Sequence, residues 1–122
     1  SKMMQVAWVG VFGLAGIFAR YFIDLGSAAL ALPYPLSTFA INIVGSFIIG
    51  FIYPLTHVSE NIKVALMVGL LGGFTTYSGY ALQTVRLIQE DKWTWAVAYF
   101  ALTPVVCVGA AFLGIALSSN SI

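Results

Sequence analysis

GLLGGFTTYSGY, residues 69–80, is the stretch that decides how this chain folds. It lies in the middle of an apolar segment, about residues 62–88, that is long enough to cross a bilayer as a helix. A glycine pair directly followed by two threonines is poor helix material. Broken backbone persists at membrane depth only where protein covers it or where it lines a water-filled cavity, and such breaks are typical of ion sites. The stretch predicts either a discontinuous helix beside an ion site or a helix whose glycines serve close packing.

Three further apolar segments surround this one, at about residues 4–23, 37–55 and 93–117. Each approaches the roughly 20 residues that a helix needs to cross a bilayer. Pro33 and Pro35 signal the first turn, Pro54 and Ser59 the second, and polar residues 89–92 the third. Hydrophobic residues make up 61% of the chain and charged residues 7%, against about 25% charged in soluble domains. We therefore predict an all-α membrane protein, one domain over residues 1–122, with four transmembrane helices and the third broken near its middle.

The same composition argues against several functions. Five Lys and Arg residues, scattered singly with a net charge of +1, cannot form a surface for nucleic acid. Cys107 and His57 are each the only residue of their type, so neither a disulfide within one chain nor a His or Cys metal cluster is expected. No nucleophile–base pair or paired carboxylate supports an enzyme.

The basic residues divide almost evenly between the two membrane faces. Lys2 and Lys63 fall on the side of the N-terminus, and Arg20, Arg86 and Lys92 on the other. The positive-inside rule needs a clear Lys/Arg bias to fix an orientation. The chain could therefore insert both ways and form an antiparallel homodimer. Alternatively, the counts are small only because the protein is small.

Polar residues recur at four-residue spacing on the second predicted span. Thr38, Asn42 and Ser46 therefore lie on one stripe of the helix. Polar side chains within a bilayer mostly face the bundle interior or a cavity. The amide of Asn42 could offer donors to an anion, or it could join two helices by a hydrogen bond.

Tyr77 and Tyr80, with either Gln83 or Thr84, lie on one face of the third span. Such rings are usually packing residues, but the positive edge of an aromatic ring can also face an anion. Arg20, near the end of the first predicted span, could attract an anion to a vestibule or extend to the lipid headgroups.

Thr103 of the fourth span precedes Pro104, so its hydroxyl could bond back to its own helix, and Cys107 follows on the same face. No Asp or Glu falls inside a predicted span, whereas a proton-coupled exporter needs a carboxylate within the membrane. This argues against the small multidrug-resistance transporters, which carry such a glutamate in the first helix.

Three motifs together resemble one family. They are GIFARY at residues 16–21, STFAINIVGSFIIG at residues 37–50 and GGFTTYSGY at residues 72–80. The whole chain resembles a Fluc (CrcB) fluoride channel, and the similarity extends over all four helices. The resemblance implies a passive channel that exports cytoplasmic fluoride across the inner (plasma) membrane.

The resemblance also implies an antiparallel, dual-topology homodimer in the lipid bilayer, with two fluoride pathways. A structural sodium ion (Na+) at the dimer interface would be held by the backbone carbonyls of Gly72 and Thr75. Asn42 would line the pore, and Tyr77 and Tyr80 stand where the family has two pore phenylalanines. The other residues implied along or near the pathway are Arg20, Thr38, Ser46, Ser78, Gln83, Thr84 and Thr103.

The chain departs from the family pattern on the face that would conduct. Tyr77 and Tyr80 replace phenylalanines, Gln83 replaces a glutamate and Gly79 replaces a small hydroxyl residue, while Ser37 replaces a glycine elsewhere. These differences raise a second hypothesis, a non-conducting or weakly conducting partner subunit in a heterodimeric fluoride channel. A proton-coupled exporter of small cations is the third.

Overall fold

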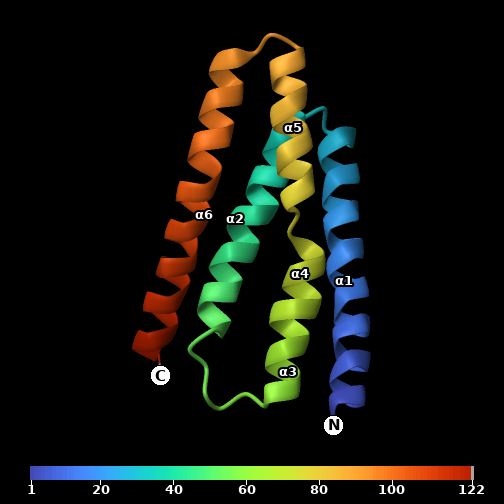
Figure 1. Ribbon diagram of the computed structural model, residues 1–122, viewed down its shortest axis with the longest axis vertical. Helices are drawn as coiled ribbons and strands as arrows, with labels where there is room; N and C mark the ends of the chain where they lie inside the picture. Colours follow the sequence, from blue (N-terminus) through green and yellow to red (C-terminus); the bar gives the residue numbers. More distant parts are fainter. Residues whose placement is uncertain (122) are drawn as a thin grey trace.

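The computed structural model describes residues 1–121 and the side chains of residues 1–119. This part of the chain is all helical (Figure 1), and its elements are α1 (Lys2–Ala29), α2 (Tyr34–Ile52), α3 (Glu60–Val64), η1 (Ala65–Leu70), α4 (Leu71–Phe74), α5 (Tyr77–Gln89) and α6 (Trp93–Ser121). The spans run alternately up and down, so the N-terminus and the end of α6 lie at the same, lower end of the bundle.

Four helices among the described residues are long and apolar enough to cross a membrane, as predicted. The predicted bounds of the first two were wrong. α1 continues past residue 23 to Ala29, since Leu25, Ala28 and Ala29 favour a helix and no proline stops the helix before Pro33. α2 begins at Tyr34 rather than 37, because Pro33 caps it and Pro35 occupies its first turn, where no backbone N–H is needed. Asp24, expected beyond the first span, consequently lies inside α1.

The third span is irregular at two places, and the predicted break is the second. η1 is a turn of π-helix, in which the N–H of Leu71 bonds to the carbonyl of Leu66, and the sequence did not predict it. After α4 the backbone becomes extended at Thr75 (φ −85°, ψ 159°) and Thr76 (φ −147°, ψ 117°), and α5 then begins at Tyr77. The glycine pair itself stays helical, and the break falls on the threonines.

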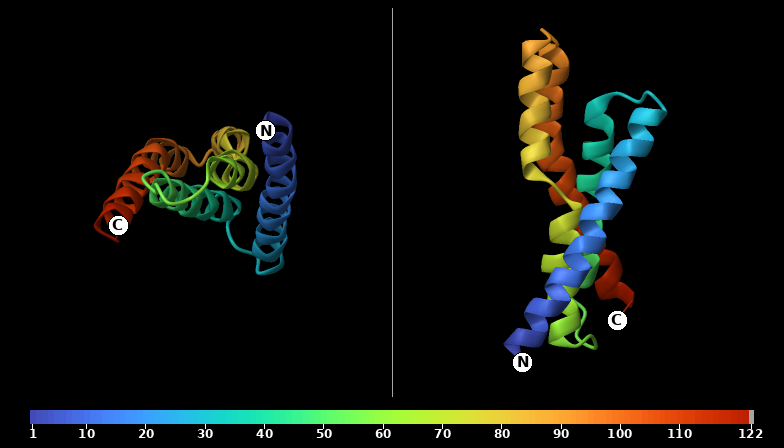
Figure 2. Two further views of the ribbon diagram at one scale, coloured as in Figure 1. Left: turned by 90° about the horizontal axis from the view of Figure 1, so that it is seen from below. Right: turned by 90° about the vertical axis from the view of Figure 1, so that its right-hand side faces the viewer.

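Glycines let the backbones of neighbouring spans pack closely, α1 against the third span and α2 against α6. A Cβ atom on Gly16 of α1 would overlap the carbonyl of Leu70, and one on Gly73 would lie 2.6 Å from the carbonyl of Gly13. Gly50 and Gly114 likewise bring α2 and α6 into backbone contact. The glycine-rich stretch therefore contains a break, as one prediction had it, and its glycines pack closely against α1, as the other had it; the ion site beside the break stays a prediction. In Figure 2, α5 and the start of α6 lean away from the α1–α2 connection at the upper end.

Candidate functional site

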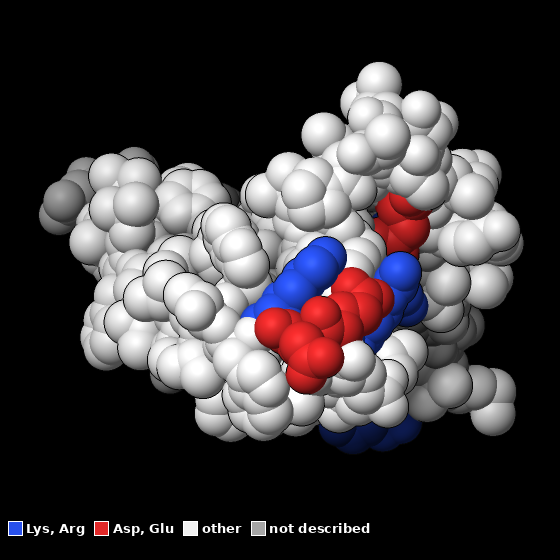
Figure 3. All heavy atoms as spheres, turned by 90° about the horizontal axis from the view of Figure 1, so that it is seen from above, with Lys and Arg blue, Asp and Glu red and all other residues white. Residues whose placement is uncertain are grey.

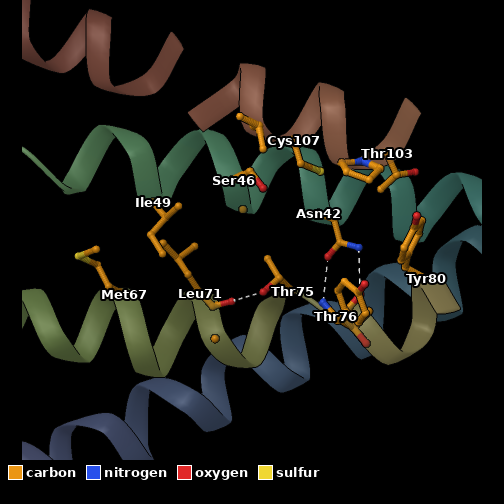
Figure 4. Close-up of a pocket in the computed structure, with 15 residues that line it drawn as sticks. Asn42, Ser46, Ile49, Met67, Leu71, Thr75, Thr76, Tyr80, Thr103 and Cys107 are labelled. Carbon is orange, nitrogen blue, oxygen red and sulfur yellow. Dashed lines mark hydrogen bonds between the residues drawn. The ribbon is translucent and has the colours of Figure 1, made fainter. Parts of the chain in front are cut away.

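A cavity of about 380 Å³ lies where the break in the third span faces α2 and α6 (Figure 4). Its polar walls come from these three spans. The predicted site residues that line it are Asn42, Ser46, Gly72, Thr75, Tyr77, Tyr80 and Thr103, together with Cys107. The residues predicted along the pathway that do not line it are Arg20, Thr38, Ser78, Gln83 and Thr84.

Asn42 binds the broken backbone with both ends of its amide (Figure 4). Its Nδ2 donates to the carbonyl of Thr76 at 3.0 Å, and its Oδ1 accepts from the N–H of Thr76 at 2.9 Å. Backbone groups without a partner are expensive at membrane depth, so this pair makes the break tolerable. The prediction of a hydrogen bond between helices is confirmed. A primary amide has two N–H bonds, so Asn42, which lines the cavity, has one more than its bond to Thr76 uses.

The side chains of the two threonines complete the ends of the neighbouring helices. The Thr75 hydroxyl donates to the carbonyl of Leu71 at 2.8 Å, one turn back in α4. The Thr76 hydroxyl accepts from the N–H of Gly79 at 3.0 Å and so caps the N-terminus of α5. Ser78 lies 3.3 Å from that hydroxyl, oxygen to oxygen, on the exposed side of the cap. The sequence TTYSG therefore stops one helix and starts the next.

These contacts leave two carbonyls without their usual helical donors. The N–H of Thr76, which would bond to the carbonyl of Gly72 in a continuous helix, is bound by Asn42 instead. The N–H of Gly79, the usual donor for the carbonyl of Thr75, is bound by the Thr76 hydroxyl. Gly72 and Thr75 are the two residues whose carbonyls the family resemblance assigns to sodium.

The two tyrosines of the conducting face have different surroundings. Tyr77 is 83% exposed and Tyr80 only 5%, although their rings meet edge to face at 5.6 Å. The hydroxyl of Tyr80 donates to the carbonyl of Phe100 at 2.6 Å. Its ring lies nearly parallel to that of Phe100 and also contacts Tyr99. Tyr80 is thus held against α6, whereas Tyr77 projects from the single chain.

A second polar group lies above the cavity and joins three spans. Gln83 donates through Nε2 to the hydroxyl of Thr38 at 2.7 Å and accepts from the Tyr99 hydroxyl at 2.9 Å. Tyr99 was not predicted as a site residue; its only signal was its position one turn before Thr103 on α6. Two other predicted hydroxyls bond back to their own helices, Thr84 to the Tyr80 carbonyl at 2.9 Å and Thr103 to the Tyr99 carbonyl at 2.6 Å. For Thr103 this confirms the local role that Pro104 indicated.

Arg20 lies well inside α1, not near its end as predicted, because α1 is longer than its apolar run indicated. Its Nε donates to the carbonyl of Gly73 at 3.3 Å. This places the guanidinium group against the glycine pair of the third span. Asp24, one turn further along α1, accepts from the hydroxyl of Ser37 at 2.9 Å.

Charged side chains of both signs lie together on the upper face (Figure 3). Glu90 is 3.0 Å from Arg86 and 3.3 Å from Lys92, nitrogen to oxygen. The Arg86 guanidinium also lies 3.9 Å from the centre of the Tyr34 ring. The hydrogen bond from Arg86 lowers the pKa of the Glu90 carboxyl below its ordinary value. Within residues 1–119, no group of three His, Cys, Asp or Glu side chains could hold a metal ion.

Four membrane spans with a cavity at a broken helix are an arrangement that membrane proteins use to handle ions. A family model described as "CrcB-like protein, Camphor Resistance (CrcB)" matches residues 7–115, and the chain belongs to this family, as its motifs indicated. It is 35% identical over 120 residues to a protein named fluoride-specific ion channel FluC from Sorangium cellulosum, with 94% of each chain covered. A FluC of the same name from Magnetococcus marinus is 38% identical over 117 residues, covering 92% of this chain and 95% of the relative. One from Gluconobacter oxydans is 40% identical over 113 residues, covering 87% and 78%. These relatives are named as ion channels and not as enzymes.

Proposed function

We propose that this chain forms a passive fluoride channel, which lets cytoplasmic fluoride leave across the plasma membrane. The observation that carries the proposal is the cavity at the break of the third span, lined by Asn42 and two tyrosines. It occurs in a chain whose relatives are named fluoride-specific ion channels. Four spans make the protein a multi-pass membrane protein.

The lining of the cavity suits a small, strongly hydrated anion. Such an ion leaves water only where donors replace its hydration shell in a narrow path. Donors at the cavity are the second N–H of Asn42 and the hydroxyls of Ser46 and Tyr77. The positive edges of the Tyr77 and Tyr80 rings add to them. The residues that line the cavity include no Asp or Glu, so no fixed negative charge opposes an anion there.

We further propose that two copies assemble as an antiparallel homodimer with two pathways. Tyr77 is 83% exposed in the single chain, in the middle of a membrane span. The cavity beside it carries polar groups that lipid cannot satisfy, which favours a protein cover. The nearly even division of Lys and Arg between the two faces is compatible with either orientation.

The dimer interface is also where a structural sodium ion fits. Sodium prefers oxygen ligands, and unwound carbonyls in broken helices supply them in other membrane proteins. The carbonyls of Gly72 and Thr75 have lost their usual helical donors to Asn42 and Thr76, so both have free lone pairs. A partner in antiparallel orientation would add the same two carbonyls. When bound, the ion would neutralise these dipoles.

A partner subunit of a heterodimer is the second candidate. It is favoured by the departures from the family pattern at Tyr77, Tyr80 and Gln83, and Gln83 is bound to Thr38 and Tyr99 instead of lining the cavity. The proton-coupled exporter has less support. Asp24, the carboxylate inside α1, is bound by Ser37 and does not line the cavity.

Fluoride efflux from liposomes, followed with a fluoride electrode, tests the proposal. The purified chain alone is reconstituted with equal pH on both sides, and a potassium ionophore balances the charge. Rapid efflux under these conditions supports a passive homodimeric channel. Efflux that appears only after a second subunit is added supports the heterodimer. Efflux no faster than from empty vesicles, with folded protein, refutes conduction by this chain.

A further inference from the structure

Pro104 interrupts the hydrogen bonds of α6 beside the cavity. Proline has no N–H, so the carbonyl four residues before it loses its helical donor. That carbonyl belongs to Phe100. Thr103, next to the proline, bonds back to Tyr99 and therefore does not replace the missing donor.

Tyr80 supplies the replacement from another helix. Its hydroxyl donates to the Phe100 carbonyl at 2.6 Å, and the residue is only 5% exposed. Its ring lies over that of Phe100 with the planes 8° apart and the centroids 6.1 Å apart. We call this hydrogen bond the Tyr80 latch. Figure 4 shows Tyr80 and Thr103 on facing elements at the same end of the cavity.

We propose that the hydroxyl of Tyr80 is a positioning group that stands in for the amide missing at Pro104. It fixes the ring on α6 with one edge toward the cavity, and it keeps the bare Phe100 carbonyl from facing the anion. Tyr80 therefore acts on the ion through its ring, while its hydroxyl is committed elsewhere. This inference rests on the proposed fluoride pathway and explains how a tyrosine serves where the family pattern has a phenylalanine.

Tyr77 provides the contrast. Its side chain is 83% exposed, and no hydrogen bond joins its hydroxyl to another residue of the described chain. The same substitution, tyrosine for phenylalanine, therefore has two different consequences at the two positions. Only at Tyr80 does the hydroxyl donate to a carbonyl, that of Phe100, whose helical donor is missing at Pro104.

The latch makes a specific prediction about pairs of substitutions. Tyr80→Phe alone leaves the Phe100 carbonyl without a donor, and an unpaired acceptor beside the pathway repels an anion. Pro104→Ala restores an N–H that can bond to the same carbonyl. In the double variant Tyr80→Phe/Pro104→Ala, the ring at position 80 has no hydroxyl and the Phe100 carbonyl again has a donor. This variant should therefore recover the fluoride efflux that the single Tyr80→Phe variant loses.

The experiment measures fluoride efflux and denaturant unfolding for the wild type, both single variants and the double variant. We expect Tyr80→Phe to slow fluoride efflux by about tenfold, corresponding to about 1.4 kcal/mol, and the double variant to return to within about threefold of the Pro104→Ala rate. The midpoint of unfolding should fall when Tyr80→Phe is made in the wild type and stay nearly constant when it is made in the Pro104→Ala variant. Tyr53→Phe, which removes the hydroxyl of an exposed residue that does not line the cavity, is the control.

The two measurements separate the latch from the proposed function. Equal effects of Tyr80→Phe in both backgrounds, in efflux and in unfolding, would overturn the latch even if the wild type conducts. A wild type that carries no fluoride overturns the proposed function alone. The unfolding midpoints of the wild type, the two single variants and the double variant then test the latch without the efflux data. Efflux that falls without recovery in the double variant would refute the role of the Phe100 carbonyl.

Discussion

Replacing Asn42 by alanine should destabilise the break in the third span more than truncation of any other side chain at the cavity. The substitution removes the two hydrogen bonds that satisfy the N–H and the carbonyl of Thr76. Leaving one such group unpaired costs about 1–3 kcal/mol, so two groups set an upper range of about 2–6 kcal/mol. Because Asn42 is only partly buried, water can reach the site and relax it, and we expect about 2–3 kcal/mol.

The assay is equilibrium unfolding of the purified protein in detergent, followed by tryptophan fluorescence. Asn61→Ala removes an equivalent amide at the start of α3 and should change the free energy of unfolding by less than about 0.5 kcal/mol. Asn42→Asp keeps the acceptor for the Thr76 N–H but turns a second carboxylate oxygen toward the Thr76 carbonyl, so it should lose at least as much stability as Asn42→Ala. An Asn42→Ala protein as stable as Asn61→Ala would refute the reasoning, because the amide would then not support the break.

Three other predictions concern neighbouring parts of the molecule. Gln83→Leu breaks the hydrogen bonds that join α2, α5 and α6, and should lower the free energy of unfolding by about 1–3 kcal/mol; an unchanged midpoint would contradict this. Gly45→Ala places a Cβ against the side chain of Thr75 and should destabilise by about 1–3 kcal/mol, whereas Gly26→Ala meets open space in α1 and should stabilise by about 0.5–1 kcal/mol. The hydrogen bond from Arg86 lowers the pKa of Glu90 below its ordinary value of 4.5. The ion pair therefore stabilises the fold at a pH above the pKa that Glu90 has in the unfolded chain, and this stabilisation is lost as the pH falls through the lowered pKa. Glu90→Gln should therefore flatten the acid side of the stability profile, slightly because the pair is exposed, and a steeper acid loss than in the wild type would disprove the sign.

The sequence predicted the spans and the break because both depend on local properties. Hydropathy over about 20 residues marks a span, and the Gly-Gly-Thr-Thr run marks a weak point in a helix. The π turn at Ala65–Leu70 left no such signal. Gly69 of this turn packs against the backbone of Val9 in α1, a contact that the local sequence does not reveal. The length of α1 beyond its apolar run was missed because hydropathy locates a span but not the residue at which its helix ends.

The candidate site was predicted in part. Spacing placed Asn42 and Ser46 on one stripe, and both line the cavity. Spacing could not show which hydroxyls are already engaged, and Thr84 proved to bond to its own helix. The choice between a helix-joining and a pore-lining Asn42 could not be made from the sequence, because a primary amide has enough donors for both. Its bond to the Thr76 backbone became visible only once α2 and the break were placed together.

The measurement that tests the central claim most directly is the initial rate of fluoride efflux from liposomes containing either the wild type or Asn42→Asp. A fixed negative charge at the cavity should exclude an anion, while the carboxylate of the variant still accepts from the Thr76 N–H. We expect the wild type to release fluoride far faster than empty vesicles, and Asn42→Asp, verified as folded, to release it at the empty-vesicle rate. Equal efflux from the two proteins would contradict a fluoride pathway through the cavity at Asn42.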